Sequence, residues 1–143
     1  MKRIYGLIIV TLVFFGCRNQ ETKLLTRSVD VGENKCIVQQ LPAEFNEGAD
    51  EKGKFDYFRV ILESKAKLTD SSHVNYVNFG MDNVMKMVID KDTISPAFVQ
   101  RIANGKKENY EYMVAFEKNE KKEPFEIVIN DNTLEIGQVS LKF

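Results

Sequence analysis

The fold class follows from the stretch Tyr57-Phe58-Arg59-Val60-Ile61-Leu62-Glu63. Within it, Phe58, Val60 and Leu62 occupy alternate positions, which is the pattern of a β-strand with one face in a core. Runs with the same period of two recur at residues 77–79, 85–89, 110–116 and 125–129, and in weaker form at 25–31, 36–41 and 134–143. We therefore expect a mostly β protein with about seven or eight strands.

The C-terminal part of the chain predicts three strands that follow one another. Apolar residues lie on even positions at Leu134 and Ile136 but on odd positions from Val139 onward. One extra residue at Gly137 would restore the core face, so we expect a β-bulge or bend there. The charged segment Lys118–Pro124 has the composition of a hairpin tip. Together these features predict a three-stranded meander over residues 109–143.

One segment breaks the period of two. Ser95-Pro96 has the residue types of a helix N-cap and first helical position, three apolar residues follow at helical spacing, and Asn104-Gly105 supplies a stop. We therefore expect one short helix near residues 96–104, at an open end of the sheets or between them.

The composition fits a single globular domain. The 143 residues are 43% hydrophobic and 29% charged, which is enough for one core and too few for two domains of ordinary size. With 20 Lys and Arg against 21 Asp and Glu, the chain lacks the basic surplus that nucleic-acid binding requires, so we expect no nucleic-acid partner. The expected architecture is an antiparallel two-sheet β-sandwich built from residues 25–143 as one domain.

The first 17 residues have the layout of a secretory signal peptide. Lys2 and Arg3 form a positive start, and the run Ile4–Phe15 is apolar at all but two positions. This run is shorter than the roughly 20 residues that a membrane-spanning helix needs, and polar residues from Arg18 onward end it. We expect residues 1–16 to be a signal peptide, with an uncleaved membrane anchor as an alternative.

The end of this run, Phe14-Phe15-Gly16-Cys17, resembles the lipobox of bacterial lipoproteins. The match covers residues 1–17 only, and Phe14 and Phe15 occupy places where a branched aliphatic and a small residue are usual. The resemblance implies lipidation of Cys17, with a diacylglycerol on its thiol and a fatty acid such as palmitate on the new amino terminus. An ordinary signal peptide with a coincidental cysteine is the alternative.

The resemblance also implies a location. In lipoproteins of Gram-negative bacteria, an acidic residue directly after the lipidated cysteine is associated with retention in the inner membrane, and here that residue is Arg18. We therefore expect a protein of the cell envelope, anchored by lipid in the outer membrane of a Gram-negative bacterium. Residues 17–24 would be the lipidated cysteine and a short tether, and the membrane is one expected partner. Stable attachment takes at least two lipid signals, which this modification supplies.

Lipidation of Cys17 would leave Cys36 as the only thiol of the mature chain, so no internal disulfide is expected. We interpret Cys36 as a small buried hydrophobic residue, and a reactive or metal-binding thiol is the alternative.

Three polar clusters are better explained as turns than as sites. Asp70-Ser71-Ser72-His73 holds the residue types of a nucleophilic triad, but four consecutive residues of a polar loop do not converge as a triad does. Asp90-Lys91-Asp92 and Asn130-Asp131-Asn132 lack the glycine and the final glutamate of a calcium loop. We predict no catalytic residue, no metal ligand and no cofactor.

Four tyrosines could line a face that binds carbohydrate or peptide. We favour core packing instead, because tyrosines at alternate positions of a strand commonly bury the ring and leave the hydroxyl in contact with water. They are Tyr57, Tyr76, Tyr110 and Tyr112.

Two classes of function remain. The first is a non-catalytic binding or structural module, for example a small subunit of a larger envelope assembly, whose protein partner is unknown. The second is a small envelope hydrolase that uses a pair of carboxylates at positions the sequence does not single out. We favour the first, because no catalytic constellation stands out in the sequence, and we predict that the protein is not an enzyme.

Overall fold

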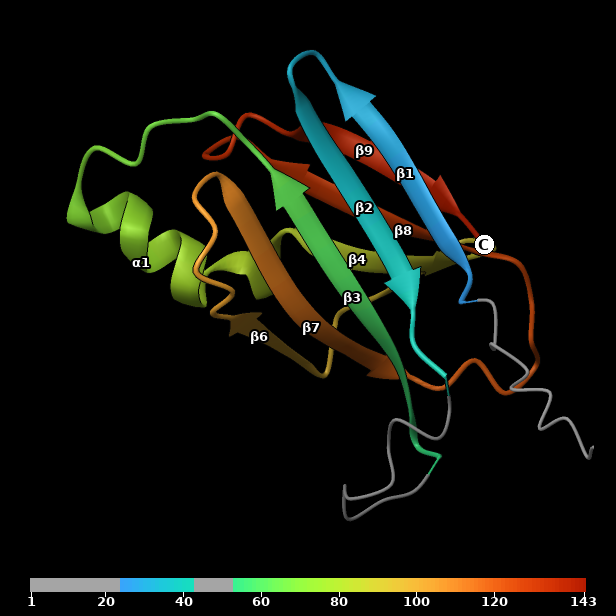
Figure 1. Cartoon of the computed structure of the whole chain (residues 1–143). Coiled ribbons are helices and arrows are strands. Elements are labelled where there is room, and N and C mark those ends of the chain that lie inside the picture. The colour runs from blue at the N-terminus through green and yellow to red at the C-terminus, as the bar shows by residue number, and fades with distance from the viewer. Residues whose placement is uncertain (1–23, 43–52) are drawn as a thin grey trace, which may run out of the picture.

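The computed structural model describes residues 24–42 and 53–143 and shows two antiparallel β-sheets packed face to face, with one α-helix beside them (Figure 1). The expected signal peptide, Cys17 and the tether up to residue 23 lie outside the described residues. The elements are β1 (Thr26–Val31), β2 (Asn34–Gln40), β3 (Phe55–Glu63), α1 (Ser71–Phe79), the short 3-10 helix η2 (Met81–Asn83), β4 (Met85–Ile89), β5 (Asp92–Ile94), β6 (Phe98–Ile102), β7 (Asn109–Glu117), β8 (Phe125–Asp131) and β9 (Gly137–Lys142).

Five strands form sheet A in the order β1-β2-β3-β7-β6, and four form sheet B in the order β5-β4-β8-β9. All neighbouring strands are antiparallel. In the middle of sheet A, β3 and β7 pair over nine positions, from Phe55 opposite Glu117 to Glu63 opposite Asn109. The prediction of a mostly β, two-sheet sandwich is confirmed, and the described residues hold nine strands where seven or eight were expected.

The core lies between the sheets and is built from the residues that gave the alternating pattern. Phe58, Val60 and Leu62 of β3 are at most 1% exposed, and side chains from the inner faces of β2, β4, β7, β8 and β9 join them. Phe58 makes edge contacts with the rings of Phe116, Phe125 and Phe143. Because burial of a large apolar side chain contributes about 1.5–3 kcal/mol, this shared core holds the two sheets together.

The two open sides of the sandwich are closed in different ways. On one side β1 packs beside β9, and Arg27 Nε donates a hydrogen bond of 2.9 Å to the carbonyl of Lys142. On the other side α1 packs against β6, and its residue Val77 is fully buried. The hydroxyl of Tyr112 in β7 donates to the carbonyl of Val77 at 2.9 Å, which fixes the helix to sheet A.

The predicted position of the helix is wrong. Residues 98–102, within the expected helix at 96–104, form strand β6, while the helix spans Ser71–Phe79 and includes the segment 77–79 that was expected to be a strand. Three apolar residues within five positions fit both a helical and a strand period, and pairing with the exposed edge of β7 decides in favour of the strand. Helix α1 has Asp70 as its N-cap residue. The Asp70 side chain accepts a hydrogen bond from the backbone N–H of His73, as N-cap side chains commonly do.

The predicted meander is also wrong. Residues 134–136 lie in the loop before β9 instead of in a strand, although the buried positions do change phase at Gly137. Strand β7 belongs to sheet A, whereas β8 and β9 belong to sheet B, so Lys118–Pro124 crosses from one sheet to the other instead of closing a hairpin. Gly137 has a φ of +68°, a conformation that favours glycine. Buried residues lie on even positions before Gly137 and on odd positions after it, namely Leu134, Ile136, Val139 and Leu141.

Candidate functional site

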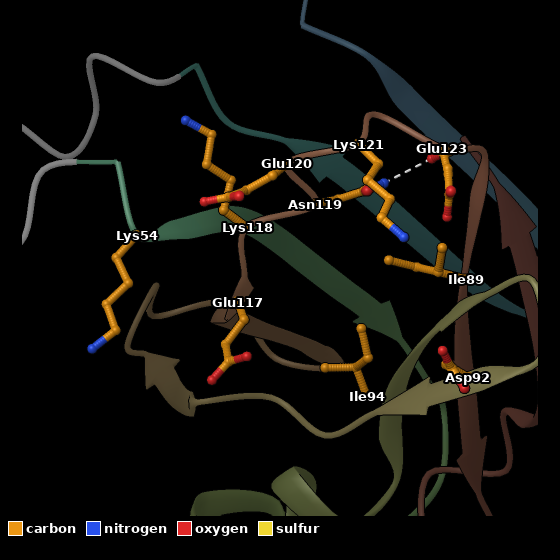
Figure 2. A pocket seen from close by; sticks show the side chains of 10 residues that line it. All are labelled: Lys54, Ile89, Asp92, Ile94, Glu117, Lys118, Asn119, Glu120, Lys121 and Glu123. Atoms are coloured by element: carbon orange, nitrogen blue, oxygen red, sulfur yellow. Dashed lines mark hydrogen bonds between the residues drawn. The ribbon is translucent and has the colours of Figure 1, made fainter.

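The candidate site is a hollow of about 540 Å³ at one end of the sandwich, between the two sheets (Figure 2). The crossover from β7 to β8 forms one wall, the hairpin of β4 and β5 forms another, and the chain entering β3 completes it. Its lining residues are Lys54, Ile89, Asp92, Ile94, Glu117, Lys118, Asn119, Glu120, Lys121 and Glu123.

The hollow combines an apolar wall with a charged rim. Ile89 and Ile94 are partly buried and pack against the core, and in Figure 2 they lie together on the sheet B side of the opening. Three lysines and four carboxylates surround them. Because positive and negative groups alternate along the crossover, the rim suits a partner or ligand that carries both signs of charge, rather than a polyanion.

Hydrogen bonds hold the crossover in place. The backbone N–H of Asn119 donates to Asp56 Oδ2 at 3.0 Å, and its side-chain amide donates to the carbonyl of Glu123 at 2.7 Å. The N–H of Lys118 donates to the carbonyl of Lys54 at 2.9 Å. The rim is therefore tied to β3 and folded back on itself, so its charged side chains project from a fixed backbone.

The hollow lies at the same end of the sandwich as Leu24, the first described residue. The start of β1 pairs with the end of β2, where Thr26 is opposite Gln39, and the start of β3 pairs with the end of β7, where Phe55 is opposite Glu117. Sheet B presents the β4–β5 turn and the end of β9 at the same end, because Arg27 of β1 contacts Lys142. The crossover and the first described residues thus share one end of the domain.

Cys36 is confirmed as a buried residue. It lies on the inner face of β2 and is fully inaccessible, and this burial raises the pKa of its thiol to about 12. A thiolate is the reactive form of cysteine and the form that binds metals, so this thiol is inert in the folded protein.

The cluster Asp70-Ser71-Ser72-His73 begins the helix α1 instead of forming a polar loop. Asp70 Oδ1 accepts hydrogen bonds from Ser72 Oγ at 2.6 Å and from the N–H of His73 at 2.9 Å, and these bonds lower the pKa of Asp70. His73 Nδ1 lies 3.7 Å from the same oxygen. The serine hydroxyl therefore donates to the aspartate and not to the histidine, which is the arrangement of a helix cap and not of a triad.

Of the two acidic clusters, the first is a turn as predicted, whereas the second begins with the last two residues of β8 and enters the loop at Asn132. Asp90-Lys91 forms the tight turn between β4 and β5, with Asp90 at a φ of +54°. Asp131 is fully buried at the end of β8, where its carboxylate accepts hydrogen bonds from the Tyr76 hydroxyl and from backbone N–H groups of the loop before β9. Within residues 24–42 and 53–143, no three His, Cys, Asp or Glu side chains are grouped so that they could hold a metal ion.

Two of the four tyrosines are core residues, as expected. Tyr112 is fully buried and Tyr110 is 9% exposed, and both lie on the inner face of β7. Tyr76 is partly buried, and its hydroxyl donates to Asp131 at 2.8 Å. Tyr57 differs, because it lies on the outer face of sheet A, where its ring makes an edge contact with Phe98 at a centroid distance of 6.0 Å.

None of the residues that line the hollow was singled out as a site by the sequence. The sequence predicts a hairpin tip at Lys118–Pro124 and a turn at Asp90-Lys91-Asp92, which lacks the pattern of a calcium loop. The hollow exists because the crossover joins two sheets, and this depends on which sheet each strand enters. No local motif in the sequence carries that information.

Comparisons with family models, with curated proteins and with solved structures found no match to this chain. In the part of the chain that the structure describes, no helix combines the length and apolar character needed to cross a membrane.

Proposed function

We propose that this protein is a lipoprotein of the cell envelope, acylated at Cys17, whose β-sandwich acts as a non-catalytic binding or structural module. The observation that carries the proposal is the order of segments: a positive start, a short apolar run, Gly16-Cys17, and then a folded domain whose first strand begins at Thr26. The expected setting is the outer membrane of a Gram-negative bacterium. In that setting the acyl chains are the contact with the membrane.

The length of the tether supports a function close to the membrane surface. Six residues lie between Cys17 and Leu24, so a fully extended chain from one to the other spans at most about 25 Å. The hollow lies at the same end of the sandwich as Leu24, so a partner bound there would contact the domain within reach of the lipid surface. The rim alternates in sign, so we infer a protein partner with mixed charges at this end.

Lipidation is tested with labelled palmitate in cells that produce the full chain. Wild-type protein should incorporate the label and remain in the membrane fraction, whereas Cys17→Ser should lose both properties. Cys36→Ala is the matched control and should keep the label, because it removes the only other cysteine. Label retained on Cys17→Ser, or a wild-type protein found in the soluble fraction, would contradict the proposal.

The role of the rim is tested by pull-down of the detergent-solubilised protein from envelopes. A module should bring down a partner in stoichiometric amount, and Lys118→Glu should reduce the yield by reversing one charge of the rim. Lys107→Glu is the control, because Lys107 is also exposed but lies before β7, at the opposite end of that strand. Equal loss with both variants would argue against the rim as the contact.

The alternative, a small hydrolase, has one structural observation in its favour. Four carboxylates line the hollow, so a catalytic pair would belong to this set: Asp92, Glu117, Glu120 and Glu123. Screening the purified protein against glycoside substrates tests this alternative, since activity that Glu117→Gln or Glu120→Gln abolishes would favour an enzyme over a module.

A further inference from the structure

Strand β6 is an open edge of sheet A. The sheets have four edge strands, and three of them are protected: β1 packs beside β9 with Arg27 bonded across to Lys142, and β5 has only three residues. In contrast, β6 is the outer strand of sheet A on the side of α1, and among the described residues it pairs only with β7 (Figure 1). Helix α1 contacts the inner face of β6 through Arg101, and no described strand pairs with its outer edge. Its five residues, Phe98-Val99-Gln100-Arg101-Ile102, include none of the lysines or prolines with which proteins usually protect an edge.

The surroundings of this edge are apolar. Large hydrophobic side chains are exposed at four positions in the described part of the chain, and two of them, Phe79 and Phe98, line a hollow of about 290 Å³ beside the start of β6. Phe79 is 82% exposed and Phe98 is 38% exposed. An exposed apolar group next to unpaired strand backbone is the combination that strand addition uses.

The one cation of β6 is already engaged within its own chain. Arg101 lies on the inner face, where its guanidinium donates to Asn78 Oδ1 of α1 and stacks over the ring of Tyr110 at 5.3 Å. The outer face of β6 then consists of Phe98, Gln100 and Ile102, which are opposite Ala115, Met113 and Glu111 of β7. On its outer face, β6 therefore presents one uncharged polar side chain, Gln100, with one apolar side chain on each side of it.

We propose that β6 pairs antiparallel with β6 of a second copy of this chain, about a two-fold axis at Gln100. In this register Phe98 lies opposite Ile102 of the second copy, and Gln100 lies opposite its own equivalent. Each Arg101 lies opposite Val99, so no like charges meet. The pairing joins the two copies of sheet A into one continuous sheet.

The neighbouring symmetric registers are less favourable. An axis at Arg101 would place two guanidinium groups opposite each other, which is destabilising. An axis at Val99 would bring Pro96 into the ladder, where it has no N–H to donate. A two-fold axis that falls between two residues would place an outer-face residue of one copy opposite an inner-face residue of the other. Such registers are excluded, because residues that pair across strands lie on the same face of the sheet. The sequence of β6 thus favours one self-complementary arrangement.

The test is a disulfide across the two-fold axis in the full chain. Gln100 is exposed, and cross-strand Cβ atoms are about 4.5–5.5 Å apart, so Gln100→Cys should form a covalent dimer on mild oxidation. The background is Cys17→Ser, which removes that thiol, and Cys36 is buried. Ser28→Cys is the matched control, because Ser28 is exposed on the same outer face but on the other edge strand of sheet A.

Purified Gln100→Cys should dimerise several-fold faster than Ser28→Cys, as followed by non-reducing gels. Adding Phe98→Lys to Gln100→Cys should abolish the difference by placing a charge at the edge, whereas adding Phe98→Leu should preserve it. Equal rates for Gln100→Cys and Ser28→Cys would overturn the proposal, as would a dimer that persists with Phe98→Lys. A crosslink of Gln100→Cys in cells to a different protein, without a dimer of the purified chain, would overturn the choice of a second copy as partner.

Discussion

Asp131 is a buried carboxylate that organises three parts of the structure. It is fully inaccessible, and it accepts hydrogen bonds from the Tyr76 hydroxyl at 2.8 Å and from the N–H of Leu134 at 2.9 Å. Burial and the bond to Asp131 raise the pKa of Tyr76, so its hydroxyl keeps the proton that it donates. One side chain therefore connects α1, the end of β8 and the loop that positions Gly137.

Replacing Asp131 should be among the most destabilising single changes outside the apolar core. Asp131→Ala would leave the Tyr76 hydroxyl and the Leu134 N–H without an acceptor, and each unsatisfied buried group costs about 1–3 kcal/mol. We expect a loss of roughly 3 kcal/mol or more, measured by chemical denaturation. Tyr76→Phe removes one donor only and should cost about 1 kcal/mol. A variant Asp131→Ala that is no less stable than Tyr76→Phe would show that the loop does not depend on this carboxylate.

The ion pair on the outer face of sheet A should make stability depend on pH. Arg59 Nε lies 2.5 Å from Glu111 Oε1, and Asn104 also donates to this carboxylate. The hydrogen bond from Arg59 lowers the pKa of Glu111 below its ordinary value of 4.5. A group whose pKa is lower in the folded state stabilises the fold fully above its unfolded pKa, and this contribution is lost as the pH falls through the folded pKa.

Wild-type protein should therefore lose stability between about pH 4.5 and more acidic values, and Glu111→Gln should lose less over the same range. Because the Arg59 side chain is 41% exposed, the contribution should be about 1 kcal/mol or less. Urea denaturation midpoints at pH 7 and pH 3.5 measure it. Arg59→Gln should remove the same pH-dependent part, and a wild-type slope in either variant would contradict the assignment.

The C-terminal strand β9 shows how an element completes the core. Leu141 is 6% exposed and lies opposite Ile127 of β8, and the ring of Phe143 stacks on Phe125 at a centroid distance of 5.2 Å. We expect Leu141→Ala to cost about 2–5 kcal/mol, because it leaves a cavity in a packed interior. Deletion of Val139–Phe143 should prevent folding.

Thermal or chemical unfolding of the full chain tests this prediction for β9. Gln138→Ala changes an exposed residue of the same strand and should stay within about 0.5 kcal/mol of wild type. A deletion variant that remains folded and monodisperse would show that β9 is peripheral.

The elements that the sequence predicted well are those with a long, regular period. Strands β3 and β8 have nine and seven residues, and their burial follows the alternation of their sequences. In β7 the alternate apolar positions are buried as well, together with Glu111 and Ala115 on the other face. The period does not distinguish helix from strand in short runs, which explains the errors at residues 77–79 and 98–102. The hollow at the crossover could not be predicted for another reason. Its residues come together because β7 enters sheet A and β8 enters sheet B, and the alternating pattern of a strand does not indicate which sheet it joins.

At the scale of the whole molecule, the outer faces of the two sheets differ in character. Sheet A carries apolar side chains outward on four of its strands, including Ile37, Tyr57, Met113 and Phe98. The outer face of sheet B is more polar: Val88 and Val128 lie on it, but so do the exposed residues Gln138, Ser140 and Lys142 of β9. The end near the tether, the edge β6 and the outer face of sheet A are therefore the parts of the surface best suited to contact other molecules.

Hydrogen exchange of the full chain should reveal this organisation as a gradient of protection. Strands β3 and β7 lie inside sheet A, β4 and β8 lie inside sheet B, and each pairs on both sides, so their amides should open only with global unfolding. The edge β6 should exchange faster in dilute protein, because half of its backbone groups face away from β7. If β6 pairs with a second copy, its protection should rise with protein concentration while that of β1 and β5 stays constant. Fast exchange in β6 at every protein concentration would show that β6 does not pair with a second copy. Slow exchange there even in dilute protein would mean that another part of the same chain covers the edge.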